Sequence, residues 1–177
     1  VYKRQHIDID EILKVVPSSL DVDVMHYDAG EESILPPVVG AIKEIVTRHD
    51  LLLATQKVVV VGAGRLVGQP SALWMQKQGA QVTIVTAETD ESLRDRLIKE
   101  ADVLVLGAGQ PKLISPEMIK EGVVIFDGGT SEDGGVLAGD ADPDCATKAS
   151  LITPVPRGIG PITVAVLLRN LVLLADQ

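Results

Sequence analysis

The residues best placed to do chemistry form a glycine-spaced turn after an apolar run. Gly62, Gly64 and Gly68 follow the stretch VVVV at residues 58–61, and the helix-forming stretch PSALWMQKQG comes next. A strand that ends in glycines and opens a helix exposes backbone N–H groups at the positive end of the helix, where a pyrophosphate binds. The last glycine gap is one residue longer than in the common G-x-G-x-x-G fingerprint, and an ordinary strand-to-helix turn is the alternative interpretation.

Two further glycine loops follow apolar runs. GAGQP at residues 107–111 ends one run, and DGGT at residues 127–130 ends another. The carboxyl ends of neighbouring parallel strands are where open α/β sheets bind ligands. We therefore expect both loops to present open backbone to the same site as the first turn. The three loops together predict that the chain binds a dinucleotide.

From Lys57 onward the sequence alternates between strand-like and helix-like stretches. This alternation predicts an α/β fold, a doubly wound parallel sheet of the Rossmann type with right-handed crossovers. Ser115 is expected to cap a short helix that has Pro116 at its first position. The predicted strands are 57–62, 81–86, 102–109, 123–129 and 150–156, the predicted helices are 70–79, 90–101, 115–122 and 160–176, and 134–140 is half of a hairpin.

The segment before Lys57 has a different character. Helices are predicted at 7–16 and 36–50, and the only candidate strand between them lies near Val22–Met25. Two helices and a loop cannot bury an independent core, so we expect the remnant of a larger domain. The first five residues, VYKRQ, match the translated end of a sequencing adapter, with a native polar tail as the alternative. The predicted division is 1–5 as adapter, 6–50 as the remnant of a larger N-terminal domain, 51–160 as a dinucleotide-binding domain, and 161–177 as a closing helix that packs back on the N-terminal domain.

Composition narrows the class of protein. Of 177 residues, 46% are hydrophobic but only 2% are aromatic, as expected for a core of aliphatic parallel strands under helices. The net charge of −9 argues against nucleic acid and against an acidic membrane surface as partners. No apolar run is long enough to span a bilayer, and no signal peptide opens the sequence. The single Cys145 fits a reducing, cytoplasmic compartment, where we expect it to be a buried small residue, and no histidine–carboxylate spacing predicts a metal site.

The motifs together are similar to those of the bifunctional methylenetetrahydrofolate dehydrogenase/cyclohydrolase family. The family pattern V-G-x-S-x-x-V-G-x-P explains the long glycine gap, and its signature P-V-P-G-G-V-G-P-M-T-V-A is matched from Pro154 to Ala165. Within that signature Arg157 replaces a glycine, Ile159 a valine and Ile162 a methionine. The resemblance covers residues 6–177, strongly from Lys57 onward and loosely before it.

The resemblance implies a folate reaction in two steps. Hydride passes from 5,10-methylenetetrahydrofolate to a nicotinamide cofactor, and water then opens the methenyl product. The family's catalytic lysine and its tyrosine lie upstream of the matching segment, so we expect no catalytic residue in this chain and little activity from it alone. The resemblance also implies a homodimer formed through the cofactor domain. The two alternatives are a catalytically empty NAD(P)-binding module and an oxidoreductase of the shikimate or amino-acid dehydrogenase type.

The same resemblance implies that residues 6–50 are the remnant of an N-terminal folate-binding and catalytic domain and that residues 51–160 are an NAD(P)-binding domain. It also assigns candidate substrate residues. Asp23 matches the aspartate that binds the pterin ring, although the family's next glycine is Val24 here; a solvated loop cap is the alternative role for Asp23. Residues 156–163 are expected to lie across the cleft between cofactor and folate, with a rigid structural turn as the alternative. The predicted substrate-binding residues are Asp23, Gly158, Gly160, Pro161 and Thr163.

The choice between NAD and NADP depends on the residues after the first two strands. Where family members place a serine or arginine for the 2′-phosphate, this chain has Ala63-Gly64 and Thr86-Ala87. Glu88 lies 20 residues after Gly68, close to where an acidic residue binds the ribose 2′-OH of NAD, so we expect NAD. Arg65 could instead bind the phosphate of NADP, and a solvated surface charge is the alternative for Glu88. The predicted cofactor-binding residues are Gly62, Ala63, Gly64, Arg65, Gly68, Thr86, Ala87, Glu88, Gly107, Gly109 and Thr130.

Overall fold

A five-stranded parallel sheet forms the centre of the molecule. The computed structural model describes residues 8–27 and 34–176, and its sheet has the strand order β2-β1-β3-β4-β7. The predicted α/β fold is confirmed, and the chain crosses over after β2 so that β3 pairs with the other side of β1. The strands are β1 (Lys57–Val61), β2 (Gln81–Val85), β3 (Val103–Leu106), β4 (Val124–Asp127) and β7 (Leu151–Ile152).

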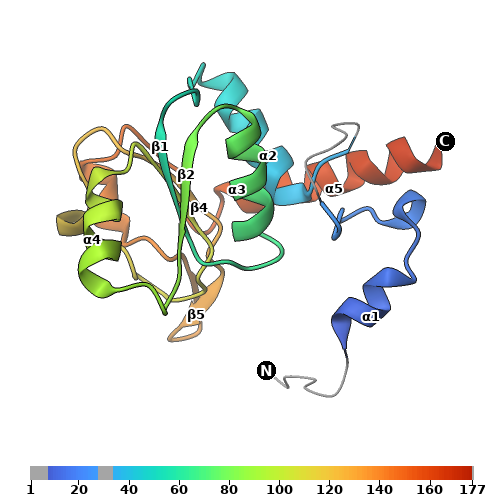
Figure 1. Cartoon of the computed structure of the whole chain (residues 1–177), viewed down its shortest axis with the longest axis horizontal. Coiled ribbons are helices and arrows are strands. Elements are labelled where there is room, and N and C mark those ends of the chain that lie inside the picture. Colours follow the sequence, from blue (N-terminus) through green and yellow to red (C-terminus); the bar gives the residue numbers. More distant parts are fainter. Residues whose placement is uncertain (1–7, 28–33, 177) are drawn as a thin grey trace.

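Helices cover both faces of the sheet. Figure 1 shows α4 on one side of the strands and α2 and α3 on the other. The helix α4 begins where the Asp90 side chain accepts the Leu93 N–H at 3.0 Å, which satisfies one of the free donors of the first turn. The helices are α2 (Pro37–Arg48), α3 (Gly68–Lys77), α4 (Glu91–Glu100) and α5 (Ile159–Ala175).

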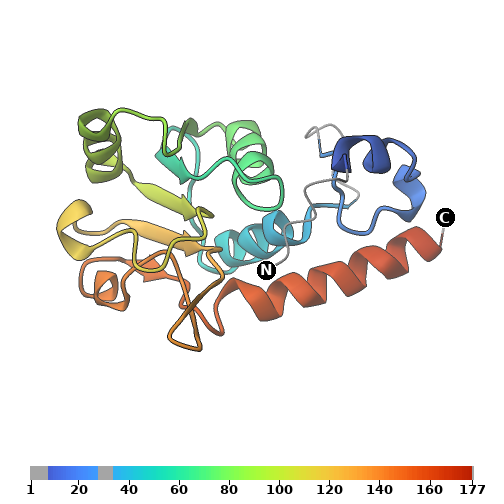
Figure 2. The same cartoon turned by 90° about the horizontal axis from the view of Figure 1, so that it is seen from below.

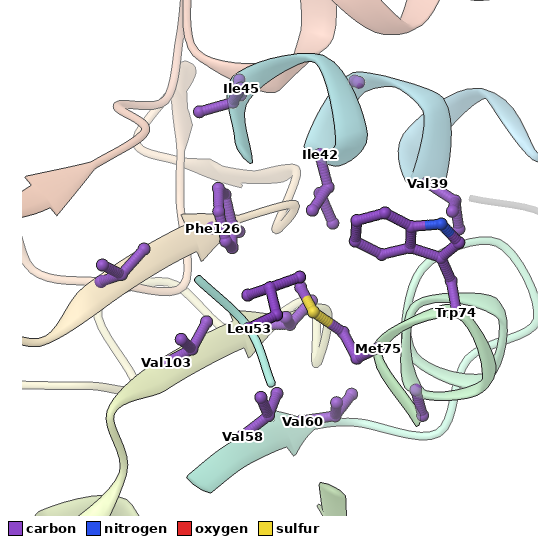
Figure 3. Packing of buried hydrophobic residues seen from close by; sticks show 14 of the residues in the cluster. Val39, Ile42, Ile45, Leu53, Val58, Val60, Trp74, Met75, Val103 and Phe126 are labelled. Carbon is purple, nitrogen blue, oxygen red and sulfur yellow. The ribbon is translucent and has the colours of Figure 1, made fainter. Parts of the chain in front are cut away.

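The alternation of side chains along β1 divides the core into two layers. Val58 and Val60 pack with Trp74 and Met75 of α3 and Ile42 of α2, as Figure 3 shows. Val59 and Val61 point to the opposite face, which α4 covers. Successive strand side chains alternate between faces, so an uninterrupted valine run is buried on both.

The closing helix α5 extends past the sheet. It packs against α2, and Figure 2 shows it running from the sheet toward the N-terminal segment. The two helices approach closely at Gly40, because a Cβ there would lie 2.6 Å from a Val166 methyl group. The short helix α1 (Ile9–Lys14) lies outside the layers of the sheet (Figure 1). No helix within the described residues has the length and apolar character needed to cross a membrane.

Two local predictions are wrong. Residues 22–25 form turns and no strand, because their backbone is closed locally by an Asp21 carboxylate that accepts the Met25 N–H at 2.7 Å. The helix predicted at 115–122 is only the 3₁₀ turn η2 (Pro116–Met118), and the Ser115 hydroxyl donates to the Glu117 carboxylate and does not cap the turn.

The remaining local predictions hold. The hairpin is present as β5 (Ser131–Asp133) and β6 (Val136–Ala138), joined by two glycines with positive φ, as tight hairpin turns require. Cys145 is completely buried within the 3₁₀ helix η3 (Pro143–Thr147), and this burial raises the pKa of its thiol to about 11. The proposed adapter residues 1–5 lie outside the described part of the chain.

Candidate functional site

Three loops at the carboxyl ends of β1, β3 and β4 enclose a groove of about 250 Å³. The strand ends are aligned, since Val61 pairs with Leu106 and Leu106 with Asp127, and this alignment brings the loops together. Five of the predicted cofactor residues line the groove. Its lining is Gly64, Arg65, Leu66, Val67, Gly107, Gly109, Gly128, Gly129 and Thr130.

The turn between β1 and α3 needs glycine at two positions. Gly62 has a φ of +99°, and a Cβ there would lie 2.6 Å from the Gly107 carbonyl oxygen. A Cβ at Gly68 would collide with the carbonyl oxygen of Gly62. Gly62 therefore closes the turn, and Gly68 lets the first turn of α3 lie directly against the end of β1.

Several backbone amides of this turn are unbonded within the part of the chain that the structure describes. Within the described residues, no group accepts the backbone N–H of Ala63, Gly64, Leu66 or Val67. These donors lie at the N-terminus of α3, where the helix dipole is positive. The turn can therefore bind an anion with several backbone N–H groups at once.

The other two loops differ from the prediction of open backbone. The Asp140 carboxylate accepts the N–H groups of Ala108, Gly109 and Gln110 at 2.7, 3.1 and 2.9 Å. After β4, the Gly128 N–H donates to the Leu106 carbonyl and the Gly129 N–H to Asp127. Most of the amides at these loops are thus already bonded within the protein, and the expectation of open backbone is wrong there.

Two buried carboxylates lie behind the groove. Asp127 is only 3% exposed and Asp140 is 0% exposed. Burial raises the pKa of Asp127, although its carboxylate accepts N–H groups from Gly129, Asp140 and Ala141 that oppose the shift. Charge buried in this way is stable only when hydrogen bonds replace the lost water, and both carboxylates have such bonds.

The residues after β2 lie beside the glycine turn but outside the groove lining. The Gly62 N–H donates to the Val85 carbonyl at 2.8 Å, which places Thr86 next to the first turn. The Thr86 hydroxyl donates to the Glu88 carboxylate, and this bond lowers the pKa of Glu88 below its ordinary value. Glu88 is exposed and remains a carboxylate at neutral pH.

A second cavity, of about 110 Å³, lies between the N-terminal segment, the start of α2, the turn before α3 and the start of α5. Asp23 and Thr163, far apart in sequence, both line it. Arg65 and Leu66 line this cavity and the groove alike, so the two spaces are neighbours. The full lining is Asp23, Val24, Met25, Pro36, Pro37, Val38, Arg65, Leu66 and Thr163.

The details around this cavity bear on the predicted substrate residues. Asp21 caps the local turn, so the exposed Asp23 carboxylate is not the cap that was the alternative for it. The Thr163 hydroxyl donates to the Ile159 carbonyl at 3.0 Å, which leaves its oxygen lone pairs for a ligand. Gly158 packs against the backbone of Thr153 and Pro154, whereas Gly160 and Pro161 are exposed and line neither space.

Sequence reasoning missed four residues that shape the site. Val67 packs against two loops, since a Cβ on Gly107 or Gly128 would lie 2.7 or 3.0 Å from its methyl group. Leu66 separates groove from cavity, and Asp140 binds the loop after β3.

The buried Asn170 amide donates to the carbonyls of Val22 and Leu35 at 2.9 and 2.8 Å, which ties the N-terminal segment to α5. Asn170 differs from its surroundings only as a polar residue in an apolar stretch, and no local pattern marks Asp140 in the stretch AGDADPD. No cluster in the described residues could hold a metal ion.

Comparison with known proteins places this geometry in a family. Residues 36–177 match the family described as tetrahydrofolate dehydrogenase/cyclohydrolase, NAD(P)-binding domain. The chain belongs to this family. The resemblance to bifunctional methylenetetrahydrofolate dehydrogenase/cyclohydrolases is thereby confirmed.

Relatives extend the likeness beyond the matched domain. The bifunctional protein FolD of Nitrosospira multiformis is 38% identical over an alignment of 181 residues, gaps included, that covers 98% of this chain and 62% of the relative. FolD of Mycoplasmopsis synoviae is 36% identical over an alignment of 182 residues that covers 95% of this chain and 64% of the relative. The chain thus spans less than two thirds of the length of these relatives.

Solved structures agree. The Campylobacter jejuni FolD methylenetetrahydrofolate dehydrogenase/cyclohydrolase superposes with a TM-score of 0.89 at 33% identity, covering 97% of this chain and 63% of that one. The Trypanosoma brucei enzyme, complexed with NADP cofactor and an inhibitor, gives 0.86 at 31% identity with the same coverage.

Proposed function

We propose that the chain binds a nicotinamide dinucleotide in the groove, with its pyrophosphate on the turn between β1 and α3. The observation that carries this proposal is that the backbone N–H groups of Ala63, Gly64, Leu66 and Val67 have no acceptor in the described residues and lie at a helix N-terminus. Membership of an NAD(P)-binding domain family supports it. The adenosine would lie toward β2 and the nicotinamide toward β3 and β4, as the strand order of doubly wound sheets requires.

We propose further that the whole protein is a methylenetetrahydrofolate dehydrogenase/cyclohydrolase of the cytoplasm. The cavity lined by Asp23 and Thr163 adjoins the groove through Arg65 and Leu66, so a folate held there would lie beside the nicotinamide. Hydride transfer would then belong to cofactor and substrate, with this chain supplying position. The general base of the cyclohydrolase step would come from residues upstream of those that match.

The pterin role of Asp23 is tested in the full-length protein. A carboxylate that accepts two N–H bonds from an amino-pyrimidinone is a charge-assisted partner whose loss costs about 1.5–3 kcal/mol. Asp23→Asn is therefore expected to weaken methylenetetrahydrofolate binding by roughly tenfold or more while leaving dinucleotide affinity unchanged. The control is Glu121→Gln, which removes one negative charge at the exposed amino end of β4. Unchanged folate affinity in Asp23→Asn would refute the assignment.

We propose NAD as the preferred dinucleotide. The Glu88 carboxylate follows the second strand and remains ionised because the Thr86 hydroxyl lowers its pKa. A fixed carboxylate there accepts a ribose hydroxyl and repels a 2′-phosphate. Arg65, at the first turn, is the residue that would favour NADP, and it lines both spaces.

Titration of the full-length protein with NAD and with NADP shows which dinucleotide it binds more tightly. We expect NAD to bind more tightly than NADP at about pH 8, and the preference should weaken near about pH 6 because the 2′-phosphate of NADP takes up a proton there while Glu88 stays ionised. Glu88→Gln should raise the affinity for NADP several-fold relative to NAD, whereas Glu121→Gln should leave the ratio alone. Tighter binding of NADP to the unmodified protein would contradict the proposal.

A further inference from the structure

The loop after β3 is held by a carboxylate from a distant part of the chain. Asp140, which is completely buried, accepts the N–H groups of three successive residues, Ala108 and Gly109 on one oxygen and Gln110 on the other. Asp140 is itself fixed by Asp127, whose carboxylate accepts the backbone N–H of Asp140 at 3.2 Å. The two acidic residues therefore act as one unit behind the groove.

Two glycines make room for this pair. A Cβ on Gly129 would collide with the Asp140 carboxylate, and a Cβ on Gly139 would collide with the Asp127 carboxylate. Each buried carboxylate thus fits into a space left by a glycine next to the other aspartate in sequence. Neither glycine has a positive φ, so the need for glycine here is one of space and not of backbone conformation.

The consequence for the groove is a wall without available N–H groups from residues 108–110. The Gly107 N–H is also bonded, to the Val61 carbonyl at 2.9 Å. In contrast, no donor among the described residues reaches the carbonyls of Gly107, Ala108 or Gly109. The Gly107 carbonyl faces the glycine turn, 2.6 Å from where a Gly62 Cβ would be. The wall after β3 can accept hydrogen bonds, while the turn after β1 can donate them.

A dinucleotide has matching chemistry in its pyrophosphate and in its nicotinamide half. Its pyrophosphate needs donors, and its nicotinamide half offers donors, namely the ribose hydroxyls and the carboxamide NH₂. We propose that Asp140 is a positioning residue that turns the amides of residues 108–110 away from the groove, so that this wall binds the donors of the nicotinamide half. The inference rests on the dinucleotide proposal above and adds the residue that separates the two subsites.

Amide hydrogen exchange tests the arrangement in the unaltered chain. Ala108, Gly109 and Gln110 are exposed residues, yet their N–H groups should exchange slowly without ligand because they are bonded to a buried carboxylate. The N–H groups of Ala63, Gly64, Leu66 and Val67 should exchange quickly and become protected on addition of ADP. Fast exchange at 108–110 in the free chain, or protection gained there with ADP, would overturn the inference.

Substitution tests the consequence for binding. Asp140→Asn places an NH₂ group against N–H donors, which frees part of the loop, so affinity for NAD or NADP should fall at least tenfold. ADP lacks the nicotinamide half, so its affinity should stay within twofold. The control is Asp142→Asn, since among the described residues the Asp142 carboxylate accepts only the Asp144 N–H, at the start of η3, and no N–H of a groove loop.

The outcomes separate the two proposals. Equal losses for ADP and dinucleotide in Asp140→Asn would mean a merely structural role and would refute the positioning role alone. Failure of the unaltered chain to bind either ADP or a dinucleotide would instead refute the proposed function. If Asp140→Asn does not fold, as thermal unfolding would reveal, the exchange pattern of the unaltered chain decides.

Discussion

Two residues adopt backbone conformations that normally belong to glycine. Val24 has a φ of +53° and Arg157 a φ of +78°, and both stand where the resembling family has glycine. The backbone at both positions thus has a conformation that glycine adopts without steric cost. A β-branched residue with positive φ is a strained exception, and Val24 also lines the cavity beside Asp23.

Restoring glycine at either position is expected to stabilise the protein. The left-handed conformation costs an L-residue about 1–2 kcal/mol, and glycine loses about 0.5–1 kcal/mol through the entropy of the unfolded chain. Val24→Gly and Arg157→Gly should each raise the free energy of unfolding by roughly 0.5–1 kcal/mol, measured by urea titration. The control Val136→Gly, at an exposed strand position without positive φ, should lower it. Destabilisation by both test substitutions would show that these backbone conformations are not strained.

At the scale of elements, the unit of β1 and α3 contains glycines with two different tasks. Gly68 has no room for a Cβ, because it would meet the carbonyl of Gly62, which is backbone and cannot move aside cheaply. Gly64 has room, because the nearest atom to its Cβ position is 3.9 Å away, and it lies exposed in the groove wall. Gly68 is needed for packing, and we expect Gly64 to be needed for ligand binding.

Alanine at these two positions should therefore separate stability from binding. Gly68→Ala is expected to cost more than about 2 kcal/mol of unfolding free energy, as overpacking against backbone does. Gly64→Ala should leave unfolding nearly unchanged but weaken dinucleotide binding tenfold or more, since a methyl group would stand between the free amides and the pyrophosphate. Calorimetric titration and urea unfolding of both variants provide the measurements. Normal dinucleotide affinity in Gly64→Ala would place the pyrophosphate elsewhere.

The elements also show which parts of the site can be predicted from sequence. The sheet, the three loops and the glycine turn follow from local patterns, because apolar runs and glycine spacing act within a few residues. The bonding of the N–H groups in the loop after β3 does not follow from a local pattern, because their acceptor Asp140 lies 32 residues from Ala108 in the sequence. The expectation of open backbone is wrong there because glycine loops of similar sequence differ in whether their N–H groups are already bonded. A backbone N–H is available only if no distant side chain accepts it.

At the scale of the whole molecule, α5 connects the two regions that the proposed reaction needs. Asn170 donates to the carbonyls of Val22 and Leu35, on either side of residues 28–33, and these bonds hold the turn containing Asp23 against the helix. Thr163, seven residues and thus about two turns earlier on α5, lines the same cavity as Asp23. The helix that lines this cavity therefore also holds the segment that carries Asp23.

The outer part of α5 carries an apolar stripe with no cover in the described residues. Val164, Leu168, Leu171 and Val172 recur at helical spacing and are each more than half exposed. We propose that the rest of the full-length protein packs on this stripe, in addition to a homodimer contact through the sheet domain. An apolar stripe of this kind drives association when it is left open to water.

The 177-residue chain is accordingly expected to self-associate through α5. Light scattering should show a mass above that of the 18.8 kDa monomer, increasing with concentration. The double substitution Leu168→Lys and Leu171→Glu puts charge on the stripe and should reduce the mass toward that of the smallest species, with dinucleotide affinity unchanged because neither residue lines the groove. Val136→Lys, which alters an exposed apolar residue of the β5–β6 hairpin, controls for added charge and should leave the mass as it was. A monodisperse monomer of the unaltered chain would contradict the role of the stripe, and an unchanged mass in the double variant alone would shift the contact to the sheet domain.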